Sequence, residues 1–207
     1  MTTTETSSLR AVALVCTLSP SPTPSSSQLL AEQTMTALGK HGVTGKVIRV
    51  ADHDVRPGVK TDMGDGDEWP KIRDAVLGAD ILILATPIWL GHPCSVAQRV
   101  MERLNAETSE TDDEGRTLTY GKVAAVCVVG NEDGAHKVSA DLFQGLDDVG
   151  FTLAPNAVTY WVGEAMQGTD YQDLDETPEA TAGTTATLAA NTAHLARLLK
   201  AAPYPAG

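Results

Sequence analysis

Apolar residues follow two alternating patterns along the chain. Short continuous apolar runs, such as residues 11–16 (AVALVC) and 80–85 (DILILA), are typical of strands that are buried on both faces. Between these runs, apolar residues recur every three or four positions, which is typical of helices with one buried face. We predict strands over residues 11–16, 46–50, 80–85, 122–129 and 157–162, and helices over residues 28–41, 69–78, 95–107, 136–149 and 185–200.

This alternation predicts an α/β fold with a parallel sheet. Because crossover connections are right-handed, few topologies remain, and we expect a doubly wound five-stranded sheet of order 2-1-3-4-5 between two layers of helices. The acidic stretches 107–116 and 163–182 lack apolar periodicity and are interpreted as solvated surface loops. We expect one domain over residues 10–202, with a disordered tail over residues 1–9 and a loose end over the last five residues.

Composition narrows the class of protein. The formal net charge of −12 argues against nucleic acid or an anionic membrane surface as a partner. Residues 1–9 lack the features of a signal peptide, and no apolar run approaches the ~18 residues of a membrane span. The three cysteines have no metal-binding or redox spacing and are interpreted as buried apolar residues. A cytoplasmic protein is therefore expected.

The loop after the first predicted strand carries candidate chemistry. Residues 17–27 (TLSPSPTPSSS) hold five serines and two threonines, and no charged side chain falls between Arg10 and Glu32. A strand, a hydroxyl-rich turn and a helix start together form an anion site, because the first N–H groups of a helix are free and carry partial positive charge. The alternative is that Ser25 to Ser27 merely cap the helix. The candidate phosphate-binding residues are Ser19, Ser21, Ser25, Ser26 and Ser27.

Two further loops are expected at the same edge of the sheet, where ligands of open α/β sheets bind. Residues 86–93 (TPIWLGHP) combine stiff prolines with large apolar residues, which could form a wall against a flat ring. The alternative is that Trp89 packs under a neighbouring helix or in a subunit interface. Residues 130–136 (GNEDGAH) offer glycines, Asn131 and free amides, while His136 could contact a ring or cap the turn. The candidates are Thr86, Pro87, Ile88, Trp89, Leu90 and Gly91 in the first loop, and Gly130, Asn131, Gly134 and His136 in the second.

No metal site is expected. Asp52, His53 and Asp54 follow the second predicted strand, but a metal needs three or four convergent ligands and no partner cluster accompanies this loop.

The segments TLSPSPTPSSS, TPIWLGHP and VVGNEDGAH, followed by YWVGEA, resemble the flavodoxin-like NAD(P)H-dependent FMN reductase family over residues 11–170. The resemblance implies that the serines of the first loop bind the FMN phosphate, that residues 87–91 flank the isoalloxazine ring, and that residues 130–136 close its other side. One departure concerns the first loop. Reductases of this family often carry an arginine there, and this chain has Ser19-Pro20-Ser21.

The resemblance implies an enzyme that takes hydride from NAD(P)H and reduces a quinone, flavin or similar small electron acceptor. It also implies a homodimer or tetramer, in which a second subunit completes the site. The alternative is a flavodoxin-type electron carrier that docks on a redox partner protein, which the acidic charge would suit.

Overall fold

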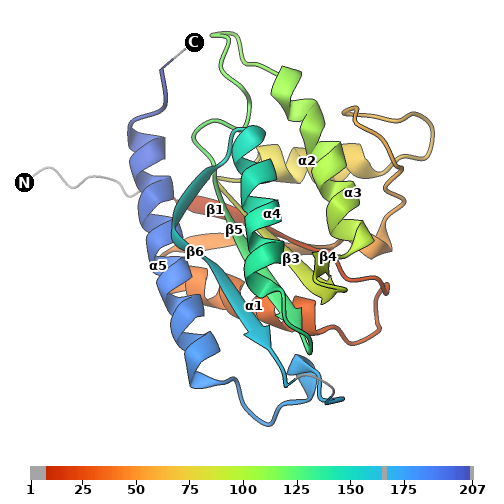
Figure 1. Ribbon diagram of the computed structural model, residues 1–207. Helices are drawn as coiled ribbons and strands as arrows, with labels where there is room; N and C mark the ends of the chain where they lie inside the picture. Colours follow the sequence, from red (N-terminus) through yellow and green to blue (C-terminus); the bar gives the residue numbers. More distant parts are fainter. Residues whose placement is uncertain (1–7, 165–166, 206–207) are drawn as a thin grey trace, which may run out of the picture.

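The computed structural model describes residues 8–164 and 167–205 (Figure 1). Strands and helices alternate as the apolar pattern predicts. The strands are β1 (Leu9–Val15), β2 (Val43–Arg49), β3 (Ile81–Trp89), β4 (His92–Pro93), β5 (Val123–Gly130) and β6 (Thr152–Val162). The α-helices are α1 (Ser26–Gly39), α2 (Trp69–Leu77), α3 (Ser95–Leu104), α4 (Ala135–Asp148) and α5 (Glu179–Ala201), and the short 3-10 helices are η1 (Val50–Asp52), η2 (Asn105–Ser109) and η3 (Tyr171–Asp173).

The sheet has the predicted order. Its five long strands pair in parallel in the order β2-β1-β3-β5-β6, and the two-residue strand β4 folds back antiparallel onto the end of β3. This is the predicted order 2-1-3-4-5, because the short strand β4 was not predicted and the fourth and fifth predicted strands are therefore labelled β5 and β6. All the long strands therefore end at one edge, where the candidate loops meet.

Two apolar layers hold helices on both faces of the sheet. In β3, Ile81 and Ile83 pack in the layer shared with α1 and α5, whereas Leu82 and Leu84 pack in the layer shared with α2, α3 and α4 (Figure 1). Because strand side chains alternate between the faces, the continuous apolar run of β3 supplies both layers. None of the described helices combines the length and the hydropathy that a membrane span needs.

Several predicted boundaries need correction. β1 begins at Leu9, which is buried and pairs with Val43, so this residue does not belong to a disordered tail; residues 1–7 lie outside the described residues. β6 begins at Thr152, five residues before the predicted start, because a register shift and Asn156 at φ 56° interrupt its alternation. α5 begins at Glu179, since hydroxyl contacts such as Thr185 to Thr159 (2.9 Å) replace apolar packing in its first turns.

The acidic stretch 107–116 is not wholly a solvated loop. Glu107 is fully buried in η2, where its two carboxylate oxygens accept hydrogen bonds from Arg73 at 2.6 and 3.0 Å. A buried carboxylate needs such a partner, and the partner lies 34 residues away in the sequence, so the pairing left no local pattern.

Candidate functional site

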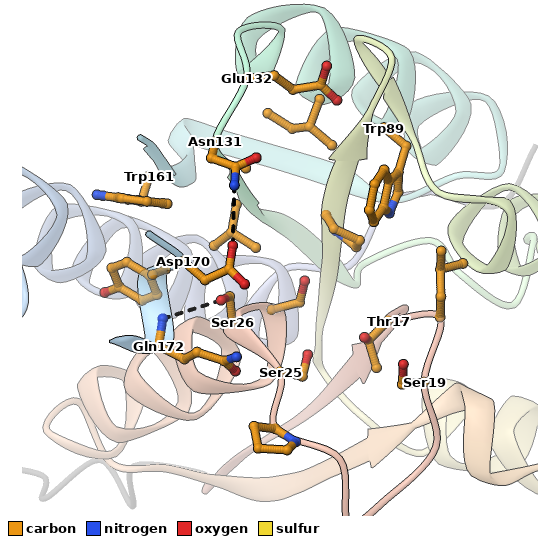
Figure 2. Close-up of a pocket in the computed structure, with 18 of the residues that line it drawn as sticks. Thr17, Ser19, Ser25, Ser26, Trp89, Asn131, Glu132, Trp161, Asp170 and Gln172 are labelled. Carbon is orange, nitrogen blue, oxygen red and sulfur yellow. Dashed lines mark hydrogen bonds between the residues drawn. The ribbon is translucent and has the colours of Figure 1, made fainter. Parts of the chain in front are cut away.

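A cavity of about 740 Å³ opens at the carboxyl edge of the sheet, between the loops that follow β1, β3, β5 and β6 (Figure 2). Its size falls within the usual range for small-molecule sites. Ten of the predicted residues line it, namely Ser19, Ser25, Ser26, Ser27, Pro87, Ile88, Trp89, Leu90, Gly130 and Asn131. The first three candidate loops therefore converge on one site.

The serines gather at the N-terminus of α1. Ser25 is the N-cap residue, and its Oγ accepts a hydrogen bond from the Gln28 N–H at 3.3 Å. Ser26 Oγ accepts the N–H of Gln172 at 3.3 Å, and Ser27 is buried at the cavity wall. Capping and anion binding are compatible here, because a hydroxyl that accepts one bond can still donate another. The free N–H groups of the first helical turn add further donors.

Ser21 lies outside the cavity lining. Its backbone N–H and its hydroxyl both donate to the Asp52 carboxylate, at 2.6 and 2.8 Å. These bonds lower the pKa of Asp52, with the backbone N–H having the larger effect. They also direct Ser21 toward the end of η1 instead of the cavity. Asp52 thus anchors the first loop to the end of η1. Among the described residues, no group of three or more His, Cys, Asp or Glu side chains could hold a metal ion.

The turn between β3 and β4 forms one wall of the cavity. Ile88 pairs with Pro93 and Trp89 pairs with His92, while Leu90 at the tip has φ 53° and is 88% exposed. The N–H of Leu90 donates to Glu132 Oε1 at 2.7 Å, so the carboxylate holds the tip in place.

Thr86 and Gly91 lie beside this wall but do not line the cavity. Thr86 is fully buried, and its Oγ1 accepts the Cys94 N–H at 3.2 Å at the start of α3. Gly91 packs against Gly134, where a Cβ would come within 3.0 Å of the Gly91 Cα. Gly134 has φ 117° and also lies outside the lining, so the absence of a side chain at Gly134 allows the two loops to approach closely.

His136 also lies outside the cavity lining. Its Nε2 is 3.3 Å from the Tyr160 hydroxyl, and the two rings meet edge to face with centroids 5.4 Å apart. These contacts fix the start of α4 against β6. The N-cap residue of α4 is Gly134, and among the described residues no side chain caps this helix, so the histidine packs on Tyr160 instead of capping the turn.

A fourth wall comes from the segment after β6, within the stretch that the sequence indicated as a solvated loop. Tyr171 is 2% exposed, donates to Gln33 Oε1 at 2.6 Å and lies against Trp161 with ring centroids 5.5 Å apart. Asp170 Oδ1 accepts the side-chain N–H of Asn131 at 3.3 Å (Figure 2). Trp161 and Trp89 lie on opposite sides of the cavity (Figure 2). The lining residues that sequence reasoning missed here are Trp161, Gln167, Gly168, Asp170, Tyr171 and Gln172.

The charge of the cavity is unusual for a site that would hold an anion. The described residues that line it include the carboxylates of Glu132 and Asp170, and no lysine, arginine or histidine. Donors at the serine end are therefore neutral hydroxyl and backbone groups. The carboxylates lie around Asn131, at the end of β5.

Residues 9–167 match the model of the NADPH-dependent FMN reductase family. The chain belongs to this family. It is therefore an enzyme of a family of FMN-dependent oxidoreductases, as the segments in its three loops implied. The matched region ends before Asp170, Tyr171 and Gln172, so the fourth wall of the cavity lies partly beyond it.

Two relatives are similar to this family member over most of its length. The 8-demethyl-8-aminoriboflavin-5'-phosphate synthase of Streptomyces davaonensis is 35% identical over 206 residues, covering 95% of this chain and 80% of that protein. The crystal structure of RosB with the bound intermediate 8-demethyl-8-formylriboflavin-5'-phosphate is 35% identical, with a TM-score of 0.86, covering 95% of this chain and 82% of that one.

A third relative is much longer. The chain is 37% identical over 200 residues to the divalent metal cation transporter MntH of Mycobacterium bovis. The match covers 93% of this chain and 29% of that protein.

Proposed function

We propose that the protein is a reductase that binds FMN in the cavity, takes hydride from NAD(P)H and passes electrons to a quinone, a flavin or a similar small acceptor. The observation that carries the proposal is the placement of Ser25, Ser26 and Ser27 at the N-terminus of α1, at one end of a cavity of about 740 Å³. Hydroxyl groups and free helix N–H groups are the donors that a phosphate monoester takes.

The remaining lining residues fit the rest of FMN. Gln172 Oε1 is buried without a hydrogen-bond partner among the described residues, and it fits a donor such as a ribityl hydroxyl. Trp89 would flank the ring from one loop, and Asn131 from the other. Ile88 and Gly130 are already in contact, since a Cβ at Gly130 would lie 3.0 Å from Ile88, so the ring would lie beside this contact and not between the two residues. The flavin supplies the redox chemistry, while the protein holds and orients it.

A second candidate function is a chemical modification of riboflavin 5'-phosphate itself. It is favoured by the 35% identity to a protein that is named as a synthase of a modified flavin phosphate, over 95% of this chain. In that case the same serines would hold the phosphate of a substrate. The open mouth of the cavity beside Leu90 would then admit a co-substrate to the ring.

One experiment separates these functions. The protein is loaded with FMN and mixed anaerobically with NADH or NADPH while absorbance near ~450 nm is followed. A reductase loses the band and regains it with an acceptor, and mass spectrometry of the extracted flavin shows FMN unchanged.

The other outcomes are equally specific. A change in the mass of the extracted flavin supports the modifying enzyme. If neither nucleotide bleaches the band and dithionite does, the reductase proposal fails and the electron carrier takes its place.

A further inference from the structure

Arg49, the last residue of β2, braces the serine turn from behind. It is 7% exposed, and its Nε donates to Gln28 Oε1 at 2.8 Å while its Nη1 donates to the Thr23 carbonyl at 2.7 Å. Thr23 precedes Ser25, and Gln28 is the residue whose N–H bonds to the Ser25 hydroxyl. The guanidinium thus joins both ends of the turn that carries the candidate phosphate ligands.

The charge of this arginine has no ionic partner among the described residues. Both of its acceptors are neutral, and no ion pair within 4.0 Å involves it. Asp52 follows three residues later, and the positive charge of Arg49 helps to lower its pKa, but its two carboxylate oxygens accept the N–H and the hydroxyl of Ser21 and form no ion pair with the arginine.

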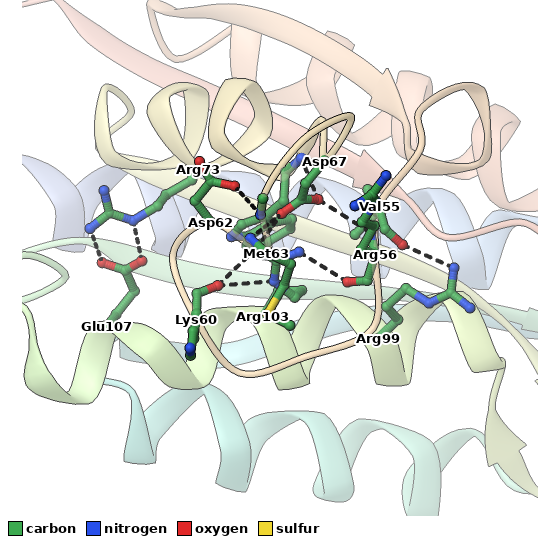
Figure 3. Close-up of polar contacts among 12 residues, drawn as sticks. Val55, Arg56, Lys60, Asp62, Met63, Asp67, Arg73, Arg99, Arg103 and Glu107 are labelled. Atoms are coloured by element: carbon green, nitrogen blue, oxygen red, sulfur yellow. Dashed lines mark hydrogen bonds and ion pairs between the residues drawn. The ribbon is translucent and has the colours of Figure 1, made fainter.

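Two other arginines, the fully buried Arg103 and the partly buried Arg73, are paired with carboxylates. Arg103 is fully buried and lies 2.8 Å from an Asp67 oxygen, and Arg73 lies 2.6 Å from Glu107 (Figure 3). Burial of a charge is costly unless an opposite charge compensates it. Arg49 differs from these two in that its hydrogen bonds lead to an anion-binding helix terminus.

We propose that Arg49 is the positioning residue for the phosphate of the bound flavin. This inference rests on the proposed function, which puts the phosphate at Ser25 to Ser27. The first loop carries no charge of its own between Arg10 and Glu32, and Arg49 supplies from β2 both a positive charge and a fixed shape for the turn. The consequence is selectivity for a phosphorylated flavin over riboflavin, which lacks the phosphate.

The test compares the affinities of FMN and riboflavin in the flavin-free full chain, by quenching of flavin fluorescence. In Arg49→Met we expect the dissociation constant for FMN to rise by about tenfold or more, because a charge-assisted contribution is lost. The constant for riboflavin should stay within about twofold, since riboflavin has no phosphate to position. Arg49→Lys keeps the charge and should recover part of the FMN affinity.

Arg99→Met is the matched control. Neither arginine lines the cavity, and Arg99 also donates to a loop carbonyl, that of Val55 at 3.1 Å. Because Val55 lies outside the serine turn that Arg49 braces, both affinities should stay unchanged in Arg99→Met. Equal losses for FMN and riboflavin in Arg49→Met would mean a merely structural arginine and would overturn the inference, as would no loss at all.

Three further outcomes are informative. If Arg49→Met does not fold, the same comparison is made with Arg49→Lys, where an unchanged ratio of FMN to riboflavin affinity together with weaker binding of both overturns the inference. A wild-type protein that binds both flavins equally overturns the role of Arg49 but leaves flavin binding intact. A wild-type protein that binds neither flavin removes the proposed function as well.

Discussion

Ser27 and Ser25 line the same end of the cavity but differ in what else they do, which makes a paired substitution informative. Ser25 caps α1 through the Gln28 N–H, whereas Ser27 is 3% exposed within the first turn and caps nothing. Ser27→Ala should therefore remove a phosphate donor alone. Ser25→Ala should remove a donor and a helix cap together.

The magnitudes follow from these contacts. A hydrogen bond to a charged group contributes about 1.5–3 kcal/mol, so Ser27→Ala should raise the dissociation constant for FMN by about 10- to 150-fold. Ser25→Ala should have a similar effect on binding and should also lower the stability of the flavin-free protein by about 1 kcal/mol. In a chain of this size that loss corresponds to a Tm about 2–4 °C lower.

Fluorescence titration with FMN and thermal melting of the flavin-free protein measure both effects. Thr36→Ala is the control, because the Thr36 hydroxyl donates to the Glu32 carbonyl on the exposed side of the same helix. Ser27→Asp should bind FMN more weakly than Ser27→Ala, since it sets like charges together. Unchanged dissociation constants in both alanine variants would refute the phosphate site.

Three further predictions concern other parts of the molecule. Burial alone would raise the pKa of Asp67, but the hydrogen bond from Arg103 and those from three backbone N–H groups outweigh it and hold the pKa well below its usual value. Asp67→Asn should lower the free energy of unfolding by about 3–5 kcal/mol at neutral pH, and in urea titrations this difference should shrink below about pH 4, where the carboxyl of the unfolded chain protonates. Asp133→Asn should raise the reduction potential of the bound flavin only slightly in a potentiometric titration, because exposed charges are screened within about 10 Å, whereas Glu132→Gln should raise it more, since the Glu132 carboxylate lines the cavity. A homodimer or tetramer is proposed from the exposed Trp89 and Leu90 at the cavity mouth (56% and 88% exposed), and a monomeric mass by light scattering at micromolar concentration would contradict it.

The sequence was sufficient to predict the strand order because each central strand is a continuous apolar run. The side chains of β1, β3 and β5 pack in both apolar layers, so nearly every position of these strands is apolar and each strand is visible in the sequence as a continuous apolar run. Boundaries were missed where hydroxyl contacts or a register shift replace apolar periodicity, as in the first turns of α5, where Thr184 and Thr185 contact Thr159, and at the start of β6.

The same reasoning explains which site residues were predicted. The loops after β1, β3 and β5 are rich in serine, proline or glycine, so they can be recognised from the local sequence alone. Residues of these loops such as Ser25 and Trp89 do line the cavity. Tyr171 and Gln172 were missed because their partners, Gln33 and Ser26, lie more than a hundred positions earlier in the chain. Arg49 lay within a predicted strand, and no strand pattern shows which loop the end of a side chain will reach.

The fourth wall also bears on when the protein can acquire its cofactor. Ser26 and Gln172 are joined by a hydrogen bond across 146 positions, so the cavity has no closed form until the chain has been synthesised past residue 172. At synthesis rates of about 5–20 residues per second, an N-terminal portion holding β1, α1 and β2 would exist for several seconds with its serine turn open to solvent. We therefore expect tight flavin binding to be a late event, because the fourth wall is complete only once η3 docks on α1, and we expect both entry and release of the flavin to depend on local opening of this segment.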